Sequence, residues 1–233
     1  MKNLRFAMKQ VMPTVPSVFF VGLAFGILLE AAGYPVIWSF LSAVFVYAGS
    51  MQIVMVSLLK AGAPLYMMAM MALFINARHI FYGIGLVEKY RRQGWKWPYL
   101  AMTLTDETYS VLCSMQCPED VDEDTVILEI SILGHLIWIC GCTFGALLGQ
   151  SIPFDMAGID FSATAFFTAV VVNQWRQFGS HIPAITGLAG ALAFYLLLGP
   201  NRFILPALAV SLLALAAMKG PLLKRMGGAP HAG

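Results

Sequence analysis

Eight long apolar runs constrain the fold of this chain more than any other feature of its sequence. They lie at about residues 13–32, 36–59, 64–86, 98–115, 125–148, 162–175, 183–198 and 202–218. About 20 apolar residues in a helix cross the hydrocarbon layer of a bilayer, so most of these runs are long enough to span it. Unpaired backbone amides are not tolerated against lipid, so spanning segments must be helical. We therefore predict an all-α polytopic membrane protein with six to eight hydrophobic segments.

The composition argues against a soluble or nucleic-acid-binding protein. Of the 233 residues, 59% are hydrophobic and 11% are charged, which is more apolar than one soluble core can hide. The formal net charge of +2 comes from short basic clusters at the ends of apolar runs, which orient a chain in a membrane. We expect residues 1–233 to form a single membrane domain embedded in the lipid bilayer, with no nucleic acid as partner.

The charged clusters predict how the chain is oriented. Basic residues gather before Pro13, at residues 89–96 and after Met218, and the positive-inside rule places all three clusters in the cytoplasm. The acidic loop at residues 119–124 is then expected on the outer face. Three full crossings by the first three runs would put the amino terminus and the second basic cluster on opposite sides. We therefore predict that one of these runs enters the membrane and returns without crossing it.

A weak internal repeat supports this arrangement. The repeated pairs, in the same order in both halves, are Phe25-Gly26 with Phe144-Gly145, Gln52 with Gln174, and Asn76-Ala77-Arg78 with Asn201-Arg202. We predict an inverted repeat of residues 11–88 and 125–219, joined by a helix at residues 98–116. In each half the second run would be a broken or re-entrant helix, as in many transporters. A plain bundle of seven or eight helices is the alternative.

Charged residues lie inside the third and fourth runs. Arg78 and His79 follow Asn76 in the third run, and Asp106 and Glu107 lie halfway along the fourth. An arginine at mid-bilayer costs about 3 kcal/mol on insertion scales, so such a residue normally faces the protein interior or a water path. We expect Arg78 to pair with one of the two carboxylates. The pair is either a static link between helices or part of a proton or substrate pathway.

Polar residues also interrupt the second run. Gly49 and Ser50 can let its helix break, and the exposed backbone of a broken helix can hold an ion or a carboxylate. The alternative is close helix packing at Gly49, with Gln52 as a hydrogen-bonding group between helices. Asn173 and Gln174 allow the same two interpretations. His135, within the fifth run, is expected to be an interior histidine.

Known catalytic patterns are missing from the sequence. It contains no HExxH, no GxSxG and no glycine-rich phosphate loop before a lysine, and its histidines and cysteines form no metal-binding pattern. We therefore expect no enzyme activity, no metal site and no cofactor.

Three motifs taken together resemble a known family. They are YAGSMQ at residues 47–52, NARHIFYG at 76–83 and LTDETY at 104–109, with AVVVNQW at 169–175 and LGPN at 198–201 in support. In this order and spacing the chain is similar to the AzlC/YgaZ family, the large subunits of branched-chain amino acid exporters, from about Val11 to Met218. Where that family often has an acidic residue before the second glutamine, this chain has Asn173, which argues against a proton role at that position.

The resemblance implies a permease subunit of the bacterial cytoplasmic (inner) membrane, with several crossings. It would export valine, leucine, isoleucine and sometimes methionine by alternating access, driven by an ion gradient. We expect the coupling ion to be the proton. It also implies a partner, a small hydrophobic membrane subunit of the AzlD/YgaH type. A membrane channel, or a structural subunit without transport activity of its own, is the alternative.

A zwitterionic aliphatic substrate needs donors for its carboxylate, an acceptor for its ammonium group and an apolar surface for its side chain. Arg78 or the backbone amides near Gly49 and Ser50 can donate to the substrate carboxylate. Asp106 or the carbonyls at helix ends can accept from its ammonium group. The candidate substrate or ion pathway comprises Gly49, Ser50, Gln52, Asn76, Arg78, His79, Asp106, Glu107, Asn173, Gln174 and Asn201.

Overall fold

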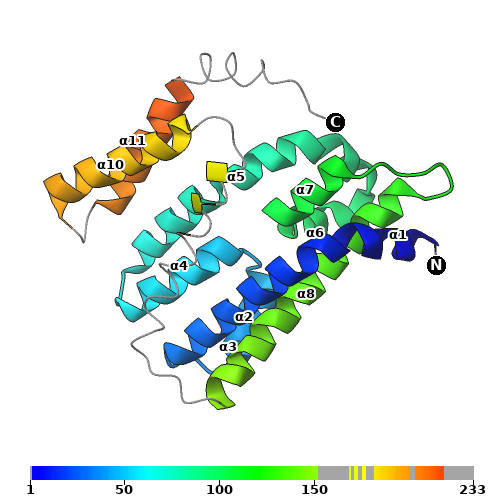
Figure 1. The fold of residues 1–233 in the computed structure, drawn as a ribbon, viewed down its shortest axis with the longest axis horizontal. Coiled ribbons are helices and arrows are strands. Elements are labelled where there is room, and N and C mark those ends of the chain that lie inside the picture. Colours follow the sequence, from blue (N-terminus) through cyan, green and yellow to red (C-terminus); the bar gives the residue numbers. More distant parts are fainter. Residues whose placement is uncertain are drawn as a thin grey trace. The chain divides into compact units, whose positions relative to one another are not determined.

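The computed structural model describes residues 2–151, 168, 171, 172, 175, 176, 181–199 and 203–217, and every regular element with defined bounds among them is a helix. The chain forms two compact units, Met1–Asp160 and Phe161–Gly233 (Figure 1). The first contains α1 (Lys2–Val11), η1 (Met12–Thr14), α2 (Val15–Ala31), α3 (Val36–Phe45), α4 (Gly49–Lys60), α5 (Leu65–Arg92), η2 (Gly94–Lys96), α6 (Trp97–Met102), α7 (Asp106–Ser114) and α8 (Glu123–Ser151). The second contains α10 (Ile182–Leu198) and α11 (Ile204–Ala217), which pack against each other.

Two of the described helical segments are long and apolar enough to cross a membrane. They are Lys2–Ala31, which joins α1, η1 and α2, and Glu123–Ser151, which is α8. Helix α5 adds a third if its two parts, Leu65–Ile80 and Tyr82–Arg92, form one span despite a bend of 65°. An α-helical membrane protein is therefore supported, while the predicted count of six to eight segments stays a prediction.

Helices α2 and α8 pack closely through glycine and lie side by side (Figure 1). Gly22 and Gly26 on α2 meet Gly141 and Gly145 on α8, and both pairs have the small-xxx-small spacing that lets membrane helices approach closely. A Cβ at Gly26 would come within 2.6 Å of the backbone nitrogen of Ala146. Glycine is required here because a side chain would force the two backbones apart.

The two helices run in the same direction. A Cβ at Gly22 would meet Cys142, and the contacts advance along both helices until Glu30 reaches Gly149. At the other end, Lys2 Nζ lies 3.1 Å from Asp120 Oδ2, just before α8 begins. The first unit therefore does not show the opposite orientation that an inverted repeat predicts for α2 and α8. The shared Phe-Gly sequence instead places glycines of both helices at one contact.

The acidic loop before α8 lies beside basic residues. Lys89 Nζ contacts Glu123 Oε1 at 2.7 Å, Arg92 contacts the same carboxylate at 3.5 Å, and Gln93 Nε2 donates to the Asp124 carbonyl at 2.7 Å. The amino terminus reaches the same loop through Lys2. For the first two basic clusters these contacts contradict the prediction that the acidic loop lies on the opposite membrane face, because the opposite charges pair directly. The third cluster, after Met218, lies outside the described residues.

The start of α8 is fixed by a capping residue. The Asp122 carboxylate accepts hydrogen bonds from the Thr125 hydroxyl and from the Thr125 backbone amide, the latter at 3.1 Å. Such a cap satisfies an amide that lacks a partner in the first helical turn. The hydrogen bond from the Thr125 hydroxyl is the main reason that the pKa of Asp122 lies below its ordinary value.

The second and fourth apolar runs are both broken. The second divides into α3 and α4 at residues 46–48, where Tyr47 has a φ of 39°, so the predicted interruption is confirmed. The fourth divides into α6 and α7, so the predicted single helix at residues 98–116 is wrong. The reason is local: Thr105 accepts a hydrogen bond from the Thr108 amide at 3.3 Å and caps a new helix with two acidic residues in its first turn.

The segment that contains α6 and α7 begins and ends at one end of the first unit. Its first residues follow Gln93 and its last precede Glu123, and the hydrogen bonds and ion pairs above hold both beside the start of α8. Between these ends its side chains reach Gly134, which lies about 16 Å along α8 at 1.5 Å per residue. The segment therefore turns back near the middle of α8.

Candidate functional site

An ion pair joins three helices at the centre of the candidate site. Arg78 Nη1, on α5, lies 2.6 Å from Asp106 Oδ2 at the start of α7, and Arg78 Nη2 donates to Ser50 Oγ on α4 at 3.0 Å. The predicted pairing of Arg78 with a carboxylate of the fourth run is confirmed, and Asp106 is the partner. The side chains of Arg78 and Asp106 are 33% and 39% exposed, so the pair borders open space.

The ion pair keeps unused hydrogen-bonding capacity. Arg78 Nε and Asp106 Oδ1 are both inaccessible to solvent, and neither meets the criteria for a hydrogen bond with any described residue. Buried polar atoms without a partner are rare in native proteins because each one costs free energy. Each member of the ion pair therefore keeps one polar atom that its protein contacts leave unsatisfied.

Three other residues of the predicted pathway lie close to this pair in the sequence, but only His79 is shown near it in space. The His79 ring centre lies 5.9 Å from that of Tyr82, and His79 is within electrostatic reach of Arg78 and Asp106. Asn76 is half-buried on α5, but residues two positions apart do not face each other on a helix. Glu107, on the turn after Asp106, lines a separate pocket.

Gln52 and Gly49 have packing roles. Gln52 is fully buried, its Oε1 accepts from the Ala48 amide at 3.0 Å, and its Nε2 donates to Ser42 Oγ at 3.3 Å. It thus links α4, in which it lies, to Ser42 of α3 and to the backbone of the break at Ala48. A Cβ at Gly49 would lie 2.9 Å from the Trp138 ring. For both residues the geometry favours the helix-packing interpretation, and Ser50 is the residue of this motif that touches the ion pair.

His135 connects the two broken segments at the middle of α8. Its Nδ1 lies 3.2 Å from the Tyr99 hydroxyl on α6, and its Nε2 lies 3.2 Å from the Ala43 carbonyl near the end of α3. A carbonyl only accepts, so Nε2 carries the proton and, in the neutral ring, Nδ1 accepts from Tyr99. The expectation of an interior histidine is confirmed. The Tyr47 ring centre lies 4.6 Å from that of His135.

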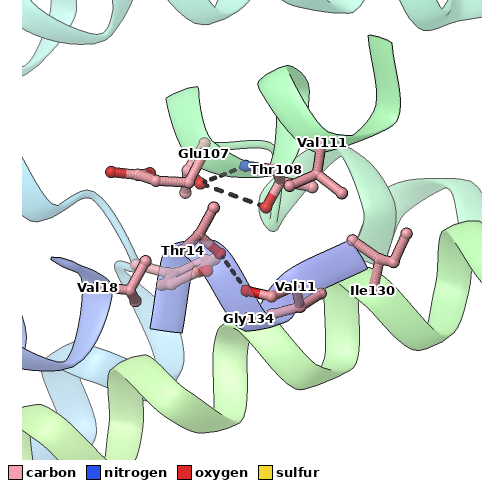
Figure 2. A pocket seen from close by; sticks show the side chains of 10 residues that line it. Val11, Thr14, Val18, Glu107, Thr108, Val111, Ile130 and Gly134 are labelled. Carbon is pink, nitrogen blue, oxygen red and sulfur yellow. Dashed lines mark hydrogen bonds between the residues drawn. The ribbon is translucent and has the colours of Figure 1, made fainter. Parts of the chain in front are cut away.

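A small pocket lies where the two breaks meet (Figure 2). Glu107, Thr108 and Val111 lie on one side, and Val11, Thr14, Val18, Ile130 and Gly134 face them. Tyr47 and Thr105 complete the lining. Its volume is about 10 Å³, enough for about one water molecule. The pocket is too small for an amino acid in this conformation.

Sequence reasoning missed several of these residues. Tyr47, Thr105, Thr108 and His135 were not among the predicted pathway residues, although all four lie at or beside the breaks. The signal for Thr105 was present, because a threonine followed by two acidic residues is a typical helix start. Asn173, Gln174 and Asn201 lie outside the residues that the structure describes. Within the described ranges, no group of three histidine, cysteine, aspartate or glutamate side chains is placed to hold a metal ion.

Long apolar helices around an interior charge pair define the class of the protein, a helical integral membrane protein. The family model described as AzlC protein matches residues 13–152. The branched-chain amino acid transport protein AzlC of Bacillus subtilis is 33% identical over 94% of this chain and 87% of its own length. An uncharacterized membrane protein of Helicobacter pylori is 34% identical over 90% of this chain and 93% of its own. The inner membrane protein YgaZ of Escherichia coli is 27% identical over 79% of this chain and 78% of its own length.

The chain therefore belongs to the AzlC family, as its motifs predict. No solved structure matches it.

Proposed function

We propose that this protein is the permease subunit of an exporter of branched-chain amino acids in the bacterial cytoplasmic membrane, driven by an ion gradient. The Bacillus subtilis relative, a branched-chain amino acid transport protein, supports the substrate class, and it aligns with 94% of this chain. A small hydrophobic subunit of the AzlD/YgaH type is its proposed partner. The outward direction and the proton as coupling ion belong to the same proposal.

The ion pair between Arg78 and Asp106 carries this proposal. Its guanidinium matches the carboxylate of an amino acid, and its carboxylate matches the ammonium group. Without substrate, each group neutralises the other at 2.6 Å, which avoids an uncompensated charge in the membrane. A zwitterion that enters between them replaces one ion pair with two, so the desolvation of both ends is compensated.

Two broken helical segments flank the pair and suit alternating access. Ser50 is the second residue of α4 and Asp106 is the first residue of α7, so each lies directly after a break. Discontinuous helices near the middle of the membrane are a common way to build a transporter site. A shift of either short helix would open the contact with Arg78 without unfolding a long helix.

Counterflow in liposomes tests the proposal. The full chain, with and without its small subunit, is reconstituted into vesicles loaded with unlabelled leucine, and uptake of labelled leucine is followed against empty vesicles. The expected result is saturable uptake stimulated by internal leucine, with competition by valine and isoleucine but not by lysine. Flux without saturation or exchange stimulation would indicate a channel, and no flux with either composition would indicate a structural subunit.

A further inference from the structure

We propose that Glu107 binds the coupling proton in the pocket at the two helix breaks, separately from the substrate site at Arg78 and Asp106. This inference rests on the proposed transport function and assigns different tasks to two adjacent carboxylates. Four features of the first unit support it: the charge pairing, the size and lining of the pocket, the surrounding ionisable groups, and the contacts between the breaks.

The pairing of charges separates the two carboxylates. Asp106 faces the Arg78 guanidinium at 2.6 Å, so protonating it would leave a positive charge without its partner. No ion pair or hydrogen bond joins the Glu107 side chain to another described residue, and Glu107 lines the pocket. Glu107 is therefore free to gain and lose a proton without breaking an ion pair.

The size and lining of the pocket select the occupant. Its volume of about 10 Å³ excludes an amino acid but admits about one water molecule, and Glu107, an exposed residue, is the carboxylate residue of its lining. Thr14 donates to the Val11 carbonyl at 2.8 Å, and the Thr105 and Thr108 hydroxyls bond to each other at 3.3 Å. These threonine oxygens keep lone pairs, but the rest of the lining is mostly aliphatic, and Glu107 supplies its charge. A proton needs only the carboxylate and a water to deliver it.

The ionisable groups around Glu107 come from five places. Asp106 precedes Glu107 on α7, and α5 contributes Arg78, His79 and Tyr82. Tyr47 lies in the first break, next to His135 of α8, which in turn contacts Tyr99 of α6. The amino-terminal helices add no ionisable side chain to the pocket lining, since they contribute Val11 of α1, Thr14 of η1 and Val18 of α2. The one permanent positive charge of this group, on Arg78, is already paired with Asp106.

The pocket lies where a change of charge can act on both broken segments. Tyr47, from the first break, lines the pocket together with Thr105 and Thr108 at the start of α7, and the Tyr47 and Thr108 hydroxyls both lie beside Gly134. Tyr47 has a positive φ, which is uncommon for a residue with a bulky side chain and is held by its surroundings. Protonation of Glu107 would therefore change the charge at the contact between the two breaks, next to the helix end that carries Asp106.

The proposed step moves a proton and involves no redox chemistry. A hydronium ion on one side of the membrane gives its proton to a carboxylate oxygen of Glu107, which leaves water and a neutral carboxylic acid. After the site has opened to the other side, the acid returns the proton to water and becomes a carboxylate again. One proton thus crosses in exchange for one amino acid that leaves by the Arg78–Asp106 site.

The number of protons moved per leucine tests this assignment. Full-length protein with its small subunit is reconstituted in liposomes that contain a pH-sensitive dye, and labelled leucine is followed in parallel after a leucine gradient is imposed. In the wild type, leucine movement should be accompanied by opposite proton movement. In Glu107→Gln the ratio of protons to leucine should fall to zero while leucine still moves down its gradient. Glu107→Asp should keep the coupling, and Glu119→Gln, an exposed loop carboxylate, is the matched control.

Each other outcome overturns the inference. A Glu107→Gln ratio equal to that of the wild type places the proton elsewhere, and leucine movement that follows a sodium gradient replaces the proton with a metal cation. A folded Glu107→Gln protein that moves no leucine places Glu107 in the substrate site instead. Absence of leucine movement in the wild type would show a failure of the proposed function itself. The other outcomes leave leucine transport intact, and the sodium outcome changes its coupling ion.

Discussion

Replacing Gly145 with alanine should destabilise the first unit by separating α2 from α8. The added Cβ would lie 2.7 Å from Leu23 Cα and 2.8 Å from the Leu23 carbonyl carbon, while ordinary contacts begin at 3.4 Å. The obstruction is backbone, which cannot move away as a flexible side chain can. The Leu23 carbonyl oxygen lies closer still, so the helices must part by more than about 0.7 Å, and a gap of 0.5–1 Å already forfeits about a quarter to a half of each nearby dispersion contact.

The expected cost of this substitution is about 1–3 kcal/mol, typical of overpacking in a well-packed interior. For a chain of this length each kcal/mol lowers Tm by about 2–4 °C, so a thermal unfolding assay in detergent resolves the change. Gly83→Ala is the matched control, because a Cβ there meets nothing within 4 Å and alanine is the better helix former by about 1 kcal/mol. A Gly145→Ala protein as stable as Gly83→Ala would refute the close glycine contact between α2 and α8.

Two further predictions concern the end of the first unit where charges of opposite sign meet. In a protein without native cysteines, single cysteines at Trp95 and Glu119 should react with an impermeant maleimide from the same membrane side; labelling from opposite sides would contradict the contacts around α8. The second prediction concerns Asp122, whose hydrogen bond with Thr125 lowers its pKa in the folded protein. The stability that this carboxylate contributes is therefore complete above the unfolded pKa of about 4. It is lost as the pH falls through the lower folded pKa. The difference in Tm between wild type and Asp122→Asn should therefore shrink in acid, and a pH-independent difference would exclude this linkage.

Charge and turn chemistry made part of the site predictable from the sequence. An arginine inside an apolar run requires a partner, and the fourth run offered two carboxylates, one of which is the observed partner of Arg78. Gly49 and Ser50 marked the break in the second run within a few residues of Tyr47. These inferences succeeded because each depends on a local cost, an unpaired charge or a weakened helix.

Predictions that depended on tertiary arrangement were less successful. The predicted membrane side of the acidic loop, opposite to the first two basic clusters, was wrong because the positive-inside rule considers each loop alone. The rule takes no account of an ion pair between loops such as that of Lys89 with Glu123. The break before α7 was missed because the apolar run was treated as continuous, although Thr105 provides a helix cap. The role of Gln52 depends on Ser42 and Ala48, whose positions only the folded chain defines.

Leucine counterflow by the Asp106→Asn protein tests the central claim most directly, because the amide has nearly the same shape as the carboxylate and lacks its charge. The assay compares wild type and variant in liposomes, after size-exclusion chromatography has shown that both are folded. The account predicts saturable counterflow in the wild type and its loss in the variant, since the ammonium group of leucine would have no carboxylate to bind. Wild-type rates of leucine counterflow in a folded Asp106→Asn protein would contradict the assignment of the Arg78–Asp106 pair as the substrate site.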